Sequence, residues 1–426
     1  MSRRWGGGDA SLGDITVRKH RPDHLIALYT GILMLIGLIL IYAIGPQRAN
    51  VLNSVFGYDY SDTYFFLKQG ASFLLAASSF VFFAIFPYRW VLKHSTQLLS
   101  VGLIACAVLA VAGWAGLGIA LTTNGATRWF DLGLLGTLQP AEILKFGVLA
   151  YMAVFLAARA KEGLVNDWRA TLMPVGVVSA IALLFVIVIQ KDLGTGIALT
   201  SIVVTMLFVA GLNRRNIAIL IGGLVVAGLL LIFTSPHRVE RVATYLRGDD
   251  TSTTDAGSYH IQHAKIALGS GGLFGVGIGK SVQASGYLPE AINDSIFAIF
   301  GETFGFFGSM ALIALFVALL MRLLRLMDHL VDVRLKLLAA GVFGWFGAHV
   351  ILNIAAMIGI FPLTGITLPL MSYGGTSMIF MTAALGLIYQ LSSYTVHTSR
   401  IKEEQSEDSH RRRGLRGPRH TSRSRS

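Results

Sequence analysis

The sequence predicts an all-α polytopic membrane protein, a bundle of ten transmembrane helices with a large extracytoplasmic loop between helices 7 and 8. Of its 426 residues, 54% are hydrophobic and only 14% are charged, whereas soluble globular proteins are about one quarter charged. Apolar stretches of about 18 residues or more recur along the whole chain. The stretches are continuous, whereas a β-barrel strand would alternate polar and apolar residues over about 10 positions. Composition and pattern therefore exclude a water-soluble domain and a membrane barrel.

The ten predicted helices are the apolar runs between polar breaks, at residues 24–45, 64–86, 99–121, 139–158, 171–189, 193–212, 216–234, 294–321, 335–361 and 370–393. The positive charges orient them. With the N-terminus inside, 25 of the 35 Lys and Arg residues fall in inner segments and 8 in outer segments, while Lys68 and Lys145 lie inside spans. Because cytoplasmic loops collect Lys and Arg, both termini are predicted to be cytoplasmic and the loop at 235–293 to face outward.

The chain is predicted to have three parts. Residues 1–23 form a basic cytoplasmic tail, residues 24–393 form the membrane domain, and residues 394–426 form a disordered, basic cytoplasmic tail. The net charge of +12 comes mostly from the basic inner segments and the second tail. The second tail is predicted to contact anionic membrane lipid or a specific partner. No nucleic-acid partner is predicted. Cys106 is the single cysteine, so the sequence predicts no intrachain disulfide and no structural zinc site.

Ionisable side chains inside spans cost a few kcal/mol and mark candidate functional positions. Glu142 and Lys145 open the fourth predicted helix three residues apart, where they can pair on one face. They form either an internal ion pair that fixes packing or the charged wall of an outward-opening cavity that receives an anionic ligand. Lys68, at the outer end of the second helix, lines the same cavity or extends to the membrane interface.

Two outer turns carry further candidates. Asp192 follows Lys191 in the segment Q-K-D-L-G-T-G at 190–196, and it either caps the sixth helix or contributes to a polar ligand site. The preceding outer loop, N-G-A-T-R-W-F at 124–130, places Arg128 beside an interfacial aromatic pair. Both turns lie at the predicted outer membrane face.

The long outer loop and its exit into the eighth helix hold the remaining candidates. An amphipathic segment at 259–265 contains Gln262, and the glycines at 269–280 permit either close backbone approach or tight turns. Glu290 and Asp294 stand where the polar loop becomes an apolar helix. Asp294 is either the helix N-cap or a carboxylate able to act as general base toward an alcohol.

The last outer segment, residues 361–377, has two prolines and no charge, and it contains Ser372 and Tyr373. Non-helical backbone at membrane depth is tolerated only where it is buried in protein or lines a cavity. The sequence therefore predicts a re-entrant or broken helix here.

Six segments in this order resemble the SEDS family of shape, elongation, division and sporulation proteins. They are N-G-A-T-R-W-F-D-L-G at 124–133, Q-P-A-E-I-L-K at 139–145, D-L-G-T at 192–195, the glycine-rich run at 269–279, Y-L-P-E-A-I-N-D-S-I-F-A-I-F-G-E at 287–302 and L-P-L-M-S-Y-G-G-T-S at 368–377. The resemblance spans roughly residues 25–395. The A-S-G-Y-L-P-E-A wording at 284–291 and the extended tails are closer to the FtsW-type division branch than to the RodA-type elongation branch.

The resemblance implies a peptidoglycan glycosyltransferase of the bacterial cytoplasmic membrane that polymerises lipid II at the outer face. It also implies a class B penicillin-binding protein, which supplies the transpeptidase, and other division proteins as partners. Asp294 falls on the family's essential aspartate, Glu142 and Lys145 on its charged pair, Asp192 on its aspartate between helices five and six, and Gln262 on a polar position of the long loop. Lys68 matches a basic position less closely. Asn293 and Ser295 replace the family's usual Thr and Phe beside the aspartate, and Lys191 replaces a Pro.

The resulting hypothesis makes Asp294 the base that deprotonates the acceptor sugar hydroxyl. Lys145, Arg128, Lys191 or a divalent cation such as Mg or Mn stabilises the departing pyrophosphate. Two other classes of function stay open. A lipid II flippase would also use charges inside spans and a broken helix, and a noncatalytic scaffold of the division machinery would not need the cavity carboxylates.

Overall fold

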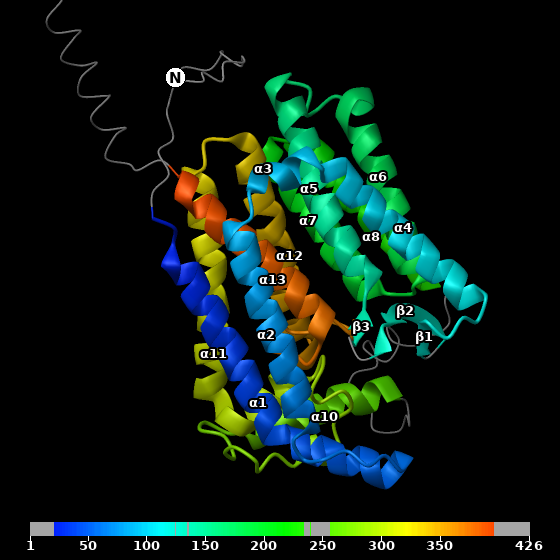
Figure 1. Cartoon of the computed structure of the whole chain (residues 1–426), viewed down its shortest axis with the longest axis vertical. Helices are drawn as coiled ribbons and strands as arrows, with labels where there is room; N and C mark the ends of the chain where they lie inside the picture. The colour runs from blue at the N-terminus through cyan, green and yellow to red at the C-terminus, as the bar shows by residue number, and fades with distance from the viewer. Residues whose placement is uncertain (1–20, 124, 134–135, 234–238, 240–255, 396–426) are drawn as a thin grey trace, which may run out of the picture.

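The computed structural model describes residues 21–123, 125–133, 136–233, 239 and 256–395. In these residues the chain is a bundle of long helices, with one short helix lying across its lower end (Figure 1). Nearly all of the predicted N-terminal and C-terminal tails, and the first part of the predicted loop at 235–293, lie outside the described residues.

The long helices occupy the ten predicted positions. They are α1 (His24–Phe56), α2 (Tyr64–Ile85), α4 (Ser95–Trp114), α5 (Pro140–Lys161), the continuous helical stretch η2–α6–η3 (Trp168–Leu172, Met173–Leu183, Leu184–Ile189), α7 (Leu193–Ala210), α8 (Arg214–Phe233), α11 (Ile296–His329), α12 (Val333–Met357) and α13 (Gly375–Leu391). Of the helices searched in the described part of the chain, nine are long and apolar enough to cross a membrane. The helix α8, with 20 residues, occupies the seventh predicted span. The prediction of a polytopic helical bundle is therefore confirmed.

Several predicted helix ends were wrong by more than one turn. The first span was predicted to stop at residue 45, before Pro46, but α1 continues to Phe56 with Pro46 inside it and ends at Gly57, whose φ is +70°. Proline removes one backbone hydrogen bond and bends a helix without always ending it, and α1 changes direction at its lower end (Figure 1). The helix α11 extends to His329 rather than to residue 321, and α13 begins at Gly375 rather than at residue 370.

A small antiparallel sheet was not predicted. The helix α4 ends at Trp114 instead of residue 121, and the chain then forms β1 (Ala120–Thr123), β2 (Ala126–Asp131) and β3 (Thr137–Leu138), in the order β1-β2-β3. The hydroxyl of Thr376, at the start of α13, donates to the carbonyl of Thr137 at 2.5 Å. The sheet is thereby attached to the bundle at its lower end (Figure 1).

Both described ends of the chain meet at one end of the bundle. The backbone N–H of Asp23 donates to the hydroxyl of Ser392 at 2.7 Å, and Leu330 forms a β-bridge with Thr395. The helix α10 (Ala256–Ser270) and the three strands lie at the opposite end (Figure 1). A chain with an even number of spans has both of its ends on the same side of the membrane, as these contacts between the two described ends require.

The glycine-rich loop after α10 packs backbone against backbone on α11. Gly305, inside α11, has φ +70°, and a Cβ atom there would lie 2.3 Å from the amide nitrogen of Gly275. The N–H groups of Val276 and Gly277 donate to carbonyls of Glu302 and Thr303 at 2.9 and 3.1 Å. Both interpretations of the glycines at 269–280 are therefore confirmed: Gly271 and Gly275 permit close approach to the backbone of α11, whereas Gly272, Gly277 and Gly279 have positive φ angles and permit turns.

Candidate functional site

The segment between α12 and α13, residues 358–374, has no regular helix, which confirms the predicted break. It is packed among helices, with Leu368, Met371 and Ser372 buried. The hydroxyl of Ser372 accepts a hydrogen bond from the N–H of Leu368 at 2.8 Å, and its carbonyl accepts one from the Gln69 amide of α2 at 3.4 Å. Backbone groups in this segment are thus satisfied by side chains rather than by a helix, as burial demands.

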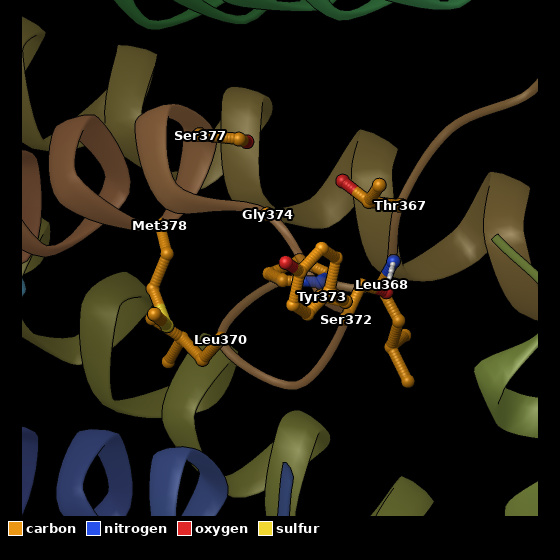
Figure 2. A pocket seen from close by; sticks show the side chains of 9 residues that line it. Thr367, Leu368, Leu370, Ser372, Tyr373, Gly374, Ser377 and Met378 are labelled. Atoms are coloured by element: carbon orange, nitrogen blue, oxygen red, sulfur yellow. Dashed lines mark hydrogen bonds between the residues drawn. The ribbon is translucent and has the colours of Figure 1, made fainter. Parts of the chain in front are cut away.

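Figure 2 shows a cavity in this segment, with Tyr373, Ser372 and Thr367 close together and Leu370 and Met378 facing one another. Its volume of about 20 Å³ is enough for a single water molecule. The ring of Tyr373 packs edge-on against Phe65, with centroids 5.6 Å apart. Ser372 and Tyr373 therefore shape the packing around the break, and this cavity does not accommodate a glycan.

Asp294 lies in a turn that precedes α11, and its side chain is half-buried. The N-cap position of α11 is occupied by Ser295, one residue after Asp294, and the Ser295 side chain makes no capping hydrogen bond. The Ser295 hydroxyl donates to the carbonyl of Pro289 at 2.8 Å and lies 2.6 Å from Nε2 of His260 on α10. The structure leaves the base interpretation of the Asp294 carboxylate in place.

The turn around Asp294 is attached to the re-entrant segment by two independent links. The N–H of Tyr373 donates to the carbonyl of Ile292 at 2.8 Å. The side-chain amide of Asn353, on α12, donates to the carbonyls of Asp294 and Ile366, both at 2.7 Å. The carboxylate-bearing turn and the helix break therefore form one unit.

Glu142 and Lys145 form the predicted ion pair, with 2.7 Å between Nζ and Oε1 and side chains 2% and 0% exposed. The Lys145 ammonium also lies 4.7 Å from the ring centroid of Trp345 on α12, a cation–π contact. The second carboxylate oxygen of Glu142 has no hydrogen-bond partner among the described residues. The pair is deep in the bundle, where an unpaired charge would be costly.

One face of α12 connects the ion pair to the Asp294 turn. Trp345, His349 and Asn353 are four residues apart in sequence, so they share a helix face and extend along about 12 Å. His349 contacts the carbonyl of Thr367 through Nδ1 at 3.3 Å. Because a carbonyl oxygen only accepts, Nδ1 carries a hydrogen, while Nε2 is buried and has no partner among the described residues.

Asp192 caps α7, as one of its two interpretations predicted. Its carboxylate accepts from the N–H of Thr195 at 2.9 Å, from the hydroxyl of Thr195 at 2.8 Å and from the Gln139 amide at 3.1 Å. Two residues on, a Cβ atom on Gly194 would lie 2.5 Å from the Ile366 side chain. The cap therefore sits beside the same re-entrant segment that Asn353 holds.

Arg128 and Lys191 bind each other's loops. The guanidinium of Arg128 donates to the carbonyls of Gln190 and Lys191 at 3.2 and 2.7 Å. The Lys191 ammonium donates to the carbonyl of Gly125 at 2.9 Å, from a residue with φ +54°. The two cations attach the hairpin of β1 and β2 to the connection before α7. These hydrogen bonds go to neutral carbonyl groups, so they do not neutralise the positive charge.

Three predicted site residues are not drawn into this cluster. Lys68 is exposed and contacts Tyr64 in the adjacent turn, at 3.3 Å from its hydroxyl, which favours its interfacial interpretation. Gln262 is exposed on α10. Glu290 is exposed, has φ +49° and hydrogen-bonds through its carboxylate with the amide of Asn293, so it shapes the turn that carries Asp294.

Four polar or aromatic residues of this region were not predicted from the sequence. Trp345, His349 and Asn353 could have been found as side chains at four-residue spacing in an otherwise apolar helix. Glu302 is buried in α11 and accepts from the Ser281 hydroxyl at 2.5 Å and from the N–H of Val282 at 3.0 Å. Its glutamate side chain fixes the loop that precedes the Asp294 turn.

A divalent cation would need donors that this cluster supplies only in part. In the part of the chain that the structure describes, no three His, Cys, Asp or Glu side chains gather around one point. Mg²⁺ is often held by one or two carboxylates together with substrate phosphates. Asp294 and a bound diphosphate would suffice for such a site, and the cation stays a prediction.

The fold and the site define a class: a polytopic helical membrane protein with a half-buried carboxylate and a buried ion pair around a broken helix. Residues 23–397 match the FtsW/RodA/SpoVE family, described as cell cycle proteins. The chain belongs to that family.

Individual relatives extend over most of the chain. Stage V sporulation protein E of Bacillus subtilis (strain 168) is 32% identical over 383 residues, which is 89% of this chain and 100% of that protein. The probable peptidoglycan glycosyltransferase FtsW of Neisseria gonorrhoeae (strain NCCP11945) is 33% identical, over 88% of this chain and 86% of that protein. The FtsW of Aliivibrio salmonicida (strain LFI1238), described in the same words, is 35% identical, over 75% and 77%.

Solved structures share the fold. A chain from a peptidoglycan synthase complex that coordinates polymerisation and crosslinking superposes with a TM-score of 0.68 at 23% identity, over 87% of this chain and 97% of that one. The rod shape determining protein RodA of Thermus thermophilus gives a TM-score of 0.63 at 23% identity, over 88% and 98%. At this identity the likeness concerns the fold alone.

Proposed function

We propose that this chain is an inverting peptidoglycan glycosyltransferase that polymerises lipid II into glycan strands, with Asp294 as the general base. The observation that carries the proposal is the placement of Asp294. Its turn is held from outside by Asn353 and by the N–H of Tyr373, while Ser295 takes the capping position. A half-buried carboxylate whose turn is fixed beside a polar cluster suits proton transfer. Relatives named as peptidoglycan glycosyltransferases support the reaction class.

The reaction proceeds by displacement at the donor sugar. Asp294 takes the proton of the acceptor 4-hydroxyl as that oxygen attacks the anomeric carbon of the donor. The bond from that carbon to the pyrophosphate oxygen breaks, its electron pair leaves with undecaprenyl pyrophosphate, and the anomeric configuration inverts. The carboxylate gains a proton and returns it to solvent before the next cycle.

Positive charge is needed where the pyrophosphate departs. Lys145 is the most buried cation of the site, paired with Glu142 and adjacent to the α12 face that leads to the Asp294 turn. Arg128 and Lys191 add charge at the loops beside Asp192. A divalent cation, if bound, would supply further charge neutralisation to the diphosphate.

The charge distribution and the similar proteins support a location, a partner and a cellular role for the reaction. The excess of Lys and Arg in alternate segments orients the Asp294 end outward and both termini toward the cytoplasm, where the lipid-linked substrate would be used at the outer face of the bacterial cytoplasmic membrane. A class B penicillin-binding protein is the proposed partner, in keeping with the synthase complex that shares this fold. The FtsW relatives favour a septal role over an elongation role.

The test is polymerisation by purified Asp294→Asn protein in detergent micelles supplied with lipid II. Asparagine preserves the shape and the backbone contacts of the turn but cannot take the proton, so we expect an unchanged unfolding temperature and no glycan strands. Asp167→Asn is the matched control, because Asp167 caps a helix elsewhere through its bond from the N–H of Ala170 and asparagine caps equally well.

Polymer made by Asp294→Asn protein at the rate of the control would overturn the assignment. Micelles have no second side, so strand formation by the unaltered protein separates a polymerase from a flippase or a scaffold. Absence of strands from unaltered protein that receives its penicillin-binding partner would reject the polymerase itself.

A further inference from the structure

We infer that Asn353 is a positioning residue for the Asp294 carboxylate: its amide locks the backbone of the Asp294 turn to the re-entrant segment. This inference rests on the proposed role of Asp294 as base. Asn353 lies in α12, is 1% exposed and is 59 residues from Asp294 in sequence. It touches the carbonyl of the very residue whose side chain is proposed to react.

The hydrogen-bond stoichiometry of the contact supports the inference. A primary amide has two N–H hydrogens, and Asn353 Nδ2 lies 2.7 Å from each of two carbonyl oxygens, those of Asp294 and Ile366. Both acceptors belong to non-helical backbone, so no helical partner replaces a lost bond. The amide therefore fixes the distance between the two segments with its full donor capacity.

Of the two links between the re-entrant segment and the Asp294 turn, only the Asn353 bond reaches Asp294 itself. The second link, from the N–H of Tyr373 to the carbonyl of Ile292, is made two residues earlier. It can hold the two segments together without setting the direction in which the Asp294 side chain leaves the backbone. Loss of Asn353 would thus loosen the orientation of Asp294 while the surrounding fold persists.

Gln390 provides a matched control in the same bundle. It is also a buried amide, in α13, and it donates to two carbonyls at the C-terminal end of α2, that of Ala84 in the last turn and that of Phe86 just after it, at 3.3 and 2.8 Å. These bonds lie at the end of the bundle where the described termini meet. Replacing either amide by leucine removes two amide-to-carbonyl bonds, but only Asn353 contacts the Asp294 turn.

The experiment compares Asn353→Leu with Gln390→Leu in the full-length protein, measuring unfolding temperature, KM for lipid II and kcat for strand synthesis. A misplacement of about 1 Å can lower a rate on the order of 10²-fold. We expect kcat of Asn353→Leu to fall by about that factor with KM changed less than about threefold. Gln390→Leu, which also removes the acceptor for the N–H of Tyr88, should lose at least as much thermal stability and keep kcat. Asn353→Ser, which retains one donor, should have an intermediate kcat, and it replaces Asn353→Leu if the latter does not accumulate.

Equal kcat for the Asn353 and Gln390 variants, or a loss confined to KM, would overturn the positioning role. The Asp294→Asn protein separates the two claims. If that protein is inactive while Asn353→Leu behaves as Gln390→Leu does, only this inference fails; if Asp294→Asn polymerises lipid II, the base and its positioning residue are both rejected.

Discussion

At the end of the bundle where the described termini meet, Gln390, Asp23 and Arg322 pair with polar groups of other elements, while Nε of Arg159 is one buried atom there without a partner among the described residues. Gln390 uses its amide for two carbonyls and accepts from the N–H of Tyr88 at 2.9 Å. Asp23 caps α1, forms an ion pair with Arg322 and donates its own N–H to Ser392. These contacts attach helix ends to one another and account for the polar atoms involved.

At the opposite end, the polar side chains around the broken helix keep unused hydrogen-bonding capacity. One oxygen of Glu142, the indole nitrogen of Trp345, Nε2 of His349, the amide oxygen of Asn353 and the hydroxyl of Thr364 are buried and have no partner among the described residues. Each such group costs free energy unless something satisfies it. The difference indicates that polar residues at the first end stabilise the bundle, whereas those at the second end are arranged for a bound polar molecule.

Among the substitutions that test this difference between the two ends, removing Lys145 should have the largest effect on stability and on strand synthesis. Lys145→Met leaves the Glu142 carboxylate buried without its cation, which typically costs about 3–5 kcal/mol of folding free energy. We expect a large drop in unfolding temperature and loss of strand synthesis.

The double variant Glu142→Gln with Lys145→Met tells the two roles of the pair apart. It removes both charges, so most of the stability should return. If Lys145 stabilises the departing pyrophosphate, polymerisation stays reduced by about 10²–10³-fold, the usual effect of losing one such donor. Recovery of activity together with stability would reduce the pair to a packing element.

A smaller effect is expected at Asp192, which belongs to the site end but is fully engaged as a cap. Asp192→Ala should lower the free energy of unfolding by about 1–2 kcal/mol, because it removes the acceptor for the N–H and hydroxyl of Thr195. Strand synthesis measured well below the unfolding temperature should fall less than tenfold. A loss as large as that of Asp294→Asn would show that the carboxylate handles substrate as well.

Features with a local sequence signal could be predicted, whereas features that depend on contacts between distant segments could not. Continuous apolar runs located ten helices, and Glu142, Lys145 and Asp294 were recognisable because ionisable groups in apolar surroundings require a partner or a function. The strands β1 to β3 are two to six residues long, too short for a clear alternating pattern. Asn353 escaped notice because its importance depends on carbonyls 13 and 59 residues away, and only the folded backbone brings these groups together.

The smallest predicted effect lies at the end where the termini meet, in the partly exposed pair of Asp332 and Arg334. Burial raises the pKa of the Asp332 carboxyl, but hydrogen bonds and charge from Arg334 outweigh it and lower the pKa below its ordinary value of 3.8. A carboxyl with a lowered native pKa stabilises the fold above its unfolded pKa, and this contribution is lost as the pH falls through the native value. Asp332→Asn keeps the cap of α12, made by accepting from the N–H of Arg334, and removes the charge.

The unfolding temperatures of Asp332→Asn and unaltered protein should therefore differ at pH 7 by the equivalent of about 1 kcal/mol or less and converge below pH 3.8. Strand synthesis should be equal at neutral pH. A difference in unfolding temperature that persists in acid would mean that the side chain contributes through packing rather than charge. A loss of strand synthesis would contradict the inference that polar residues at this end serve stability alone.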